Sequence, residues 1–376
     1  MRIAFMKRVI KRIMYILLAI IVIIVIAVFL LGRSAPIGTL ATGERLEKMS
    51  SNPNFKNGAY ENLEVTPAIK EGVSSFEILR SFFFGKDKRN VPSKPLPSIK
   101  TDLKNLDINE NLLVWFGHSS YLLQLDGKRI LVDPVFNKYA SPVPFGIKAF
   151  QMTYNYTAAD MPDIDVLVIT HDHFDHLDYS TFEEIKGRTK QIVTSLGVGA
   201  HFEKWGYPTD KIHELYWGES FQVDSLTFTA APARHFAGRW FKRNTSLWSA
   251  FVLQSPTYKL LLGGDSGYGK HFKTIGEEHG PFDLVLLENG QYNEYWKYIH
   301  MMPEEVIQAA EDLRAKDLIP VHSGKFPLAY HAWDEPLIRV TNEAKRKNRP
   351  IWTPQIGQVV YLGQANQFSE WWKNID

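Results

Sequence analysis

Three histidines and two aspartates fall within six residues, His171-Asp172-His173-Phe174-Asp175-His176, directly after an apolar run that ends at Ile169. In an extended segment His171 and His173 point to the same side, so both imidazoles can bind one metal ion. A following turn can bring Asp175 and His176 to a second ion. Imidazole and carboxylate without thiolate suit zinc, iron or manganese in an open catalytic site. The cluster therefore predicts a metal centre rather than an ordinary polar surface.

Further histidine and aspartate residues occur downstream, each just after an apolar run or in the short loop that follows one. They are His235, Asp265 in Gly263-Gly264-Asp265-Ser266-Gly267, and His322 after Ile319-Pro320-Val321. Taken singly, each has an ordinary explanation as a hydrogen-bonded histidine or a turn aspartate. Because all of them lie at predicted strand ends, together with the first cluster they favour a binuclear site.

Composition limits the remaining possibilities. The chain has 376 residues, 45% hydrophobic and 22% charged, and no cysteine. This is a globular composition without a disulfide framework, a thiol nucleophile or thiolate zinc ligands. Residues 1–33 hold six of the 43 basic residues and no acid, so 37 basic residues oppose 41 acidic ones in the body, a net charge of −4. We therefore expect no nucleic-acid partner.

The N-terminal segment is apolar over 18 consecutive residues, 14–31. At about 1.5 Å per residue this length just spans a bilayer core, which predicts a transmembrane helix. A cleaved signal peptide is the alternative, but its apolar region is normally shorter and residues 32–36 make a poor cleavage site. Five cations precede the run and Arg33 follows it. We therefore expect a cytoplasmic N-terminus and a single-pass anchor in the cell membrane, with the catalytic body outside.

Short strands alternate with helical stretches from about residue 110 to the end, which predicts one α/β domain. The clearest helix is Pro303 to Ala315, with proline in its first turn. We expect an anchor at 1–33, a tether and apolar packing segment at 34–100, and the catalytic domain at 101–376. Within the second segment, the apolar residues between Phe76 and Phe84 either pack onto the body or contact lipid. Predicted strands lie at 112–116, 120–125, 129–132, 166–169, 191–194, 226–230, 249–254, 259–262, 284–287, 318–321 and 359–362.

The order of these motifs resembles the metallo-β-lactamase superfamily, whose fold is an αββα sandwich with a dinuclear site at one sheet edge. Within it, the chain is similar to the N-acylphosphatidylethanolamine-hydrolysing phospholipase D group and its bacterial relatives. The supporting strings, which span about residues 76–365, are Trp115-Phe116-Gly117-His118-Ser119-Ser120, Val132-Asp133-Pro134, Gly264-Asp265-Ser266-Gly267-Tyr268, His300-Met301-Met302-Pro303 and His322-Ser323-Gly324-Lys325-Phe326.

The resemblance implies two zinc ions, although iron or manganese also suits the donors. One ion would be held by His171, His173 and His235, the other by Asp175, His176 and His322, with Asp265 bridging. It implies catalytic roles for Asp175, Asp265 and His300, the last in contacting substrate; a structural hydrogen bond is the alternative for His300. His118 and Asp133 would orient ligands, and His331 would be a surface or packing residue.

The implied reaction is hydrolysis of N-acylphosphatidylethanolamine-type phospholipids to N-acylethanolamine and phosphatidic acid by a metal-bridging hydroxide. The phospholipid and the membrane are then the expected partners, with a possible homodimer. A zinc-dependent lactonase or other acyl-ester hydrolase is the alternative, and a non-enzymatic membrane scaffold ranks last. The sequence departs from the family pattern at two places that shape the substrate pocket. Glu288 is charged where apolar residues are expected, and the loop 237–248 is basic.

Overall fold

Side chains of the central strands point alternately to an inner core between the two sheets and to an outer core beneath the covering helices. The structure, a computed structural model, describes residues 2–373 and 375. In β3 (Leu112–Trp115), Leu113 and Trp115 point to the inner core, whereas Leu112 and Val114 point to the outer one. All four are buried, as expected of a strand that is covered on both faces.

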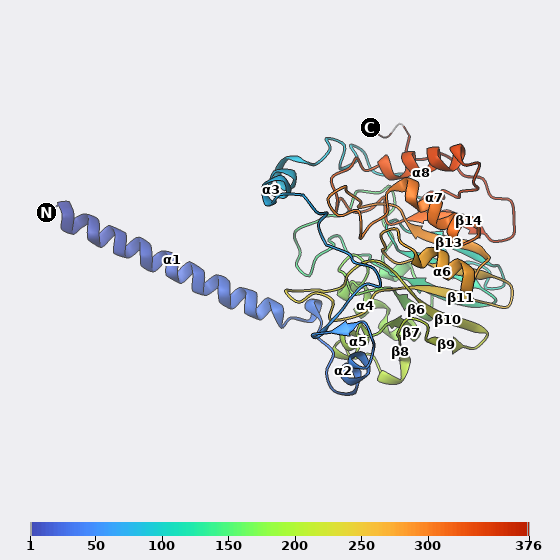
Figure 1. The fold of residues 1–376 in the computed structure, drawn as a ribbon, viewed down its shortest axis with the longest axis horizontal. Coiled ribbons are helices and arrows are strands. Elements are labelled where there is room, and N and C mark those ends of the chain that lie inside the picture. Colours follow the sequence, from blue (N-terminus) through green and yellow to red (C-terminus); the bar gives the residue numbers. More distant parts are fainter. Residues whose placement is uncertain (1, 374, 376) are drawn as a thin grey trace.

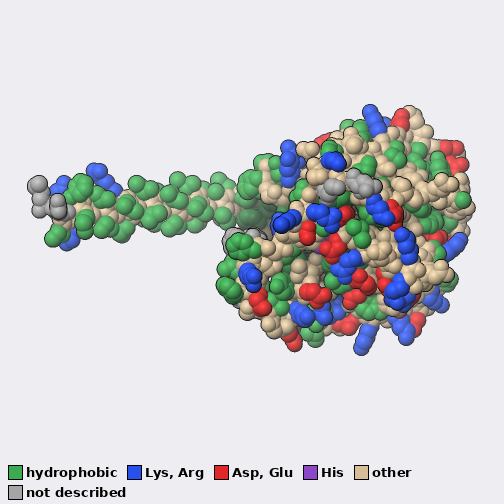
Figure 2. Space-filling model, turned by 90° about the horizontal axis from the view of Figure 1, so that it is seen from above, with side chains coloured by type: hydrophobic (Ala, Val, Ile, Leu, Met, Phe, Trp, Pro, Cys, Tyr) green, Lys and Arg blue, Asp and Glu red, His purple; other side chains and the backbone are tan. Residues whose placement is uncertain are grey.

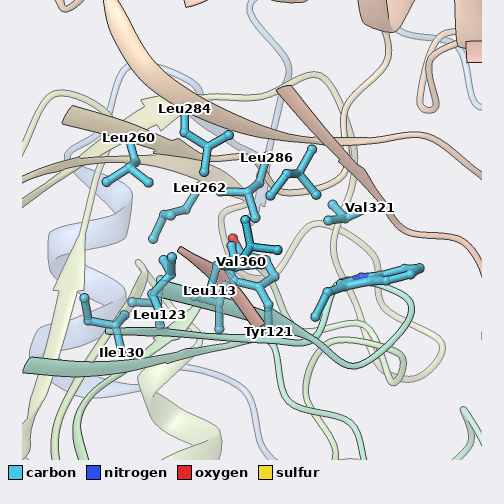
Figure 3. Close-up of a cluster of buried hydrophobic side chains, with 14 of the residues drawn as sticks. Leu113, Tyr121, Leu123, Ile130, Leu260, Leu262, Leu284, Leu286, Val321 and Val360 are labelled. Atoms are coloured by element: carbon cyan, nitrogen blue, oxygen red, sulfur yellow. The ribbon is translucent and has the colours of Figure 1, made fainter. Parts of the chain in front are cut away.

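Two sheets share the inner core. The seven-stranded sheet has the order β15-β3-β4-β5-β6-β7-β8 and the six-stranded sheet the order β14-β13-β12-β11-β10-β9. Leucines from both sheets, such as Leu123 and Leu262, meet between them (Figure 3). The other strands of the first sheet are β4 (Tyr121–Leu125), β5 (Lys128–Val132), β6 (Ile164–Ile169), β7 (Thr189–Ser195), β8 (Ile212–Leu215) and β15 (Val359–Tyr361). The second contains β9 (Ser220–Val223), β10 (Leu226–Pro232), β11 (Ser249–Gln254), β12 (Lys259–Leu262), β13 (Phe282–Glu288) and β14 (Ala315–Val321).

Helices cover the outer faces of both sheets (Figure 1). On the first sheet, Phe182 of α4 (Tyr179–Ile185) and Phe202 of α5 (Gly199–Lys204) join the outer core. On the second, α6 (His271–Glu278), α7 (Pro303–Asp312) and α8 (Glu335–Arg346) do the same. The predicted αββα sandwich is confirmed. Short 3-10 turns lie at Ala35–Ile37, Leu103–Asn105, Ala158–Asp160, Lys186–Arg188 and Thr209–Lys211.

Parallel pairing brings several strand ends to one edge. β5, β6 and β7 run parallel, as do β12, β13 and β14. Strand β10 points the same way as β12, because β11 lies antiparallel to both. The loops that follow β5, β6, β10, β12 and β14 therefore leave from carboxyl ends of the two sheets.

Most predicted strands agree with the structure to within one to three residues at each end, and the larger differences concern one helix and two strands. The helix expected to reach Ala315 ends at Asp312, because Arg314 adopts a left-handed backbone (φ 54°) and Ala315 already begins β14. Strands β8 and β9 were not predicted: Ile-His-Glu-Leu lacks apolar alternation, and Ser-Phe-Gln-Val alternates over only four residues.

The N-terminal helix α1 (Arg2–Gly32) projects from the body with its apolar side chains exposed (Figures 1 and 2). Its stretch Phe5–Gly32 is long and apolar enough to cross a membrane, as an anchor or as a signal sequence.

Residues 35–60, the first part of the predicted tether and apolar packing segment at 34–100, pack on the body. Their elements are α2 (Gly43–Ser50), β1 (Phe55–Lys56) and β2 (Ala59–Tyr60). Met49 and Tyr60 are buried in one cluster with Trp217 and Trp248. Helix α3 (Ser75–Phe84) follows on the side from which α1 projects (Figure 1), and the side chains of Phe76, Leu79 and Phe84 are exposed.

Candidate metal centre

The seven predicted ligands converge at the shared edge of the two sheets. The loop after β6 carries His171, His173, Asp175 and His176, and the ends of β10, β12 and β14 supply His235, Asp265 and His322. Their donor atoms form overlapping groups in which all atoms lie within 4.8 Å of one another. Residues separated by up to about 150 positions in the sequence thus meet because parallel strands end together.

The first group consists of His171, His173, His235 and Asp265. The Nδ1 atom of His173 lies 2.9 Å from His171 Nε2 and 3.3 Å from His235 Nε2. Asp265 Oδ2 lies 3.9 Å from His171 Nε2 and 3.6 Å from His235 Nε2. Three imidazole nitrogens and one carboxylate oxygen therefore surround one point, as in a tetrahedral site.

The second group consists of His118, Asp175, His176 and His322. Asp175 Oδ2 lies 3.5 Å from His176 Nε2 and accepts a 2.8 Å hydrogen bond from His118 Nε2. Asp265 also reaches this group, at 3.2 Å from His176 Nε2 and 3.1 Å from His322 Nδ1. Asp265 lies between the groups, which is the place of a bridging ligand.

Buried polar atoms without a hydrogen-bond partner test whether these residues fit metal ions. Among the described residues they include His176 Nε2, His322 Nε2 and Asp265 Oδ1. An unsatisfied buried polar atom costs about 1–3 kcal/mol, and three of them on neighbouring ligand residues call for a missing partner. Imidazole and carboxylate donors in this arrangement fit two divalent ions, with zinc, iron and manganese all compatible.

Asp133 orients the His176 imidazole directly and the His171 imidazole through Thr170. His176 Nδ1 donates to Asp133 Oδ2 at 2.8 Å, and the Thr170 hydroxyl donates to the same oxygen at 2.6 Å. The Thr170 hydroxyl oxygen lies 3.0 Å from His171 Nδ1 and can accept its proton. These bonds turn the Nε2 atoms of His171 and His176 toward the cluster, as metal sites require.

Three of the ten non-glycine residues with a positive φ in the described part of the chain lie at this edge. His118, Asp133 and His322 adopt left-handed backbones with φ of 53°, 39° and 65°. Such a conformation costs a non-glycine residue about 1–3 kcal/mol and marks functional sites when the fold enforces it.

Protonation follows from burial and neighbouring charge. Burial, helped by the imidazoles of His176 and His173, holds the pKa of His171 well below its usual value. Burial likewise lowers the pKa of His235 and of His322, so these rings are neutral and offer lone pairs. Burial raises the pKa of Asp265, but the surrounding imidazoles, His176 first, outweigh it and keep the carboxylate ionised.

His176 behaves in the opposite way. Burial lowers its pKa, yet Asp265 and Asp175 outweigh burial and raise it well above the usual value. The point between these carboxylates therefore favours a positive charge, which a divalent ion would supply.

Contacts with His300 and Met301 explain why a charged residue, Glu288, lies at the end of β13. Its carboxylate accepts from His300 Nδ1 at 3.0 Å and from the Met301 backbone N–H at 2.5 Å. Burial raises the Glu288 pKa to about 7, although His300 opposes the rise. His300 in turn forms a donor group with Asp265 and His322. The structure thus places His300 at the centre, held from behind by Glu288.

Arg239 is a functional candidate that the sequence did not reveal. It is buried, and its guanidinium donates to the carbonyls of Asp172 and Leu177, which bracket the ligand loop, at 2.8 and 2.7 Å. It also donates to the carbonyls of Pro36 and Ile37, just beyond α1. Only the basic composition of loop 237–248 signalled this residue.

Asp172 is a second link between the ligand loop and the N-terminal segment. Thr39 N–H donates to His201 Nδ1 at 3.0 Å, so His201 Nε2 donates to Asp172 Oδ2 at 3.3 Å. Gly38 allows this approach, since a Cβ there would lie 2.0 Å from His201 Nδ1 and its φ is 78°.

The centre opens into a cavity of about 480 Å³. His173, Asp175, His235, Asp265, His300 and His322 line its floor, and the walls are largely apolar. Arg243 lies at the cavity, with its guanidinium over the Phe236 ring at 4.6 Å. The apolar wall residues are Ala68, Ile69, Phe236, Trp296, Ile299 and Leu328.

The remaining predicted residues lie outside the cavity. His331 is half-buried and packs, accepting a hydrogen bond from Gln291 N–H at 2.9 Å. Trp205, Trp217 and Trp248 are core residues, whereas Trp240 is 37% exposed.

The sequence matches a known protein family and is similar to several known proteins. Residues 128–323 match the model described as "Beta-lactamase superfamily domain". An uncharacterized protein of Mycobacterium tuberculosis is 37% identical over 346 residues, which cover 91% of this chain and 93% of that protein.

N-acyl-phosphatidylethanolamine-hydrolyzing phospholipase D 1 of Caenorhabditis elegans is 32% identical over 227 residues, 57% of this chain and 64% of that protein. Among solved structures, the metallo hydrolase Igni18 of Ignicoccus hospitalis aligns with a TM-score of 0.52 and 19% identity, covering 66% of this chain and 97% of that one. The last likeness concerns the fold alone.

Proposed function

The chain belongs to the beta-lactamase superfamily of metal-dependent hydrolases, and from this we propose that it is a membrane-anchored, dinuclear-zinc phosphodiesterase. The proposed substrates are N-acylphosphatidylethanolamine-type phospholipids, and the products are N-acylethanolamine and phosphatidic acid. The partial likeness to the Caenorhabditis elegans phospholipase D supports this substrate class.

The cavity over the metal centre carries the proposal. Its floor combines members of both donor groups with His300, and its walls are largely apolar. Apolar walls suit acyl chains, and the Arg243 guanidinium suits a phosphodiester oxygen. A compact polar lactone would leave these walls without a partner.

Two bound metal ions would supply a water-derived nucleophile at neutral pH and stabilise charge on phosphoryl oxygens. His171, His173 and His235 would hold one ion, Asp175, His176 and His322 the other, with Asp265 between them. His300 faces the same cavity, and Glu288 fixes its ring so that Nε2 points away from the carboxylate. We assign His300 the role of contacting the phosphoryl or leaving-group oxygen.

The anchor agrees with a lipid substrate. Helix α1 is apolar over residues 14–31, within the candidate span Phe5–Gly32, and these residues are largely exposed, which suits lipid surroundings. We propose a single-pass cell-membrane protein with its basic N-terminus in the cytoplasm and the body outside. Fusing a reporter that is active on only one side of the membrane to each end tests this orientation.

The reaction is tested with the detergent-solubilised, zinc-loaded full chain and a defined N-acylphosphatidylethanolamine, with products identified by mass spectrometry. We expect free N-acylethanolamine plus phosphatidic acid, and neither from Asp265→Asn. Intact phospholipid, with turnover of a lactone panel by the same preparation, would refute the proposal and move the attack to carbon. An Asp224→Asn variant is the matched control, because Asp224 is exposed and its ion pair in the described part of the chain is with Lys128 on the surface.

A further inference from the structure

A second cavity, of about 470 Å³, lies where α1 meets the body. Its lining comes from Gly32 at the end of α1 and the following Arg33, from residues 37–40, from residues 239–242 with Thr245, and from Asp172, His201 and Lys204 of the body. It shares no lining residue with the cavity over the metal centre. Its volume is within the range of small-molecule and lipid sites.

The position of this cavity is set by the membrane helix. The candidate span ends at Gly32, and a Cβ on Gly32 would lie 3.0 Å from the indole nitrogen of Trp240. Trp240 therefore packs against the end of α1, while the neighbouring Phe241 is 78% exposed. A tryptophan beside the end of a span is typical of the membrane–water interface. The cavity lies at the level where acyl chains meet headgroups.

The charge of the lining is strongly positive. Arg33, Lys204, Arg239 and Lys242 oppose a single carboxylate, that of Asp172. Asp172 is already satisfied, since Gly238 N–H donates to Oδ1 at 2.7 Å and the Ser246 hydroxyl to Oδ2 at 2.8 Å.

The four cations differ in their partners. Arg239 and Lys204 donate hydrogen bonds to backbone carbonyls; Lys204 donates to those of Arg33, Ser34 and Gly38. Among the described residues, neither Arg33 nor Lys242 forms an ion pair with a carboxylate; Arg33 lies over the Phe29 ring at 4.1 Å.

We propose that this cavity binds one phospholipid with a net negative headgroup from the surrounding membrane. An acyl chain lies along the apolar lining beside Ile37, Leu40 and Trp240, and the phosphate faces Arg33 and Lys242. A free inorganic anion would leave the apolar lining empty, and a zwitterionic lipid would leave the positive charge uncompensated. The inference rests on the proposed function only in placing α1 in a membrane.

The test uses the full chain in nanodiscs that contain equal amounts of phosphatidylglycerol and phosphatidylcholine. Native mass spectrometry counts the lipids that stay bound when the disc is removed. We expect the wild type to retain phosphatidylglycerol preferentially, and the double variant Arg33→Gln/Lys242→Gln to lose most of this preference, by roughly fivefold for each cation. Thr245→Phe, which fills the cavity without changing charge, should lower retention of the same lipid.

The matched control is Lys104→Gln/Lys316→Gln, which removes the same charge from exposed positions elsewhere on the body. It should retain phosphatidylglycerol as the wild type does. Equal loss in both double variants, or no preference in the wild type, would overturn the cavity site. Because the readout is lipid retention, it is independent of turnover. A chain recovered entirely in the soluble fraction would overturn this inference together with the membrane part of the proposed function.

Discussion

The two cavities differ in how their lining is built. Over the metal centre, donor atoms are fixed from outside by hydrogen bonds such as His176 to Asp133 and His235 Nδ1 to the Ile299 carbonyl, at 2.8 Å each. At the foot of α1, the lining is apolar side chains and dispersed positive charge. Chemistry at the first depends on atomic positions, so single changes there should have large effects. Binding at the second depends on summed charge and volume, so single changes should be modest and nearly additive.

Asp265→Asn should have the largest effect. Asp265 lies between the two donor groups, and the amide replaces an ionised bridging oxygen by a neutral group. We expect turnover to fall at least about 10³-fold and the metal content to drop below two ions per chain. Metal analysis alongside steady-state kinetics measures both. Retention of two ions and of activity would show that Asp265 does not bridge.

Glu288→Gln should lower turnover while leaving the metal content intact. The variant keeps the shape of the side chain but loses the charge that holds His300. We expect about a 10–100-fold decrease in kcat, the usual effect of removing an orienting partner. In combination with His300→Gln it should add little, because both act through the same ring. Additive losses in the double variant would separate the two residues.

Arg239→Gln tests the connection between the two cavities. It removes donors from four backbone carbonyls that tie the ligand loop to residues 36 and 37. We expect about 2–4 kcal/mol lower stability and about tenfold weaker metal binding. Lys242→Gln, in the same loop, is the control and should change neither; denaturant unfolding with and without zinc gives both quantities. Wild-type metal affinity in Arg239→Gln would mean that the ligand loop does not depend on the N-terminal segment.

The smallest expected effect concerns Lys325, which should make the free energy of unfolding depend on pH. Burial lowers its pKa from 10.5 to about 8, and its ammonium donates to the Val135 carbonyl at 2.5 Å. Between those two pH values the unfolded chain binds more protons than the folded one, so the free energy of unfolding should rise with pH. The slope is at most about 1.4 kcal/mol per pH unit.

Lys325→Met has no titrating group at this position and should lack this contribution. Unfolding of both proteins at several values between pH 8 and 10 measures the difference. Parallel curves for the two proteins would show that Lys325 titrates normally in the folded state.

Local patterns in the sequence predicted one α/β domain and the seven donor residues, and the resemblance to the metallo-β-lactamase superfamily implied the sandwich. Apolar runs gave the central strands, and ligand spacing in residues 171–176 gave the first cluster. Parallel pairing of β12, β13 and β14 then explains why Asp265 and His322 join it. The assignment of particular ligands to particular ions stays a prediction.

Contacts between distant segments could not be predicted in this way. Arg239 forms its hydrogen bonds with backbone carbonyls, which have no signature in the sequence. The packing of Met49 and Tyr60 against Trp248 likewise depends on chain crossings that apolar spacing does not reveal. Glu288 looked like a departure from an apolar strand end, and only its contact with His300 explains the charge.

Isotope labelling tests the central claim, attack on phosphorus at the dinuclear centre, most directly. The zinc-loaded full chain would turn over N-acylphosphatidylethanolamine in water enriched in oxygen-18. The account predicts one labelled oxygen in the phosphatidic acid and none in the N-acylethanolamine. Label in a released fatty acid or in the N-acylethanolamine would contradict it, because the water oxygen would then have attacked carbon.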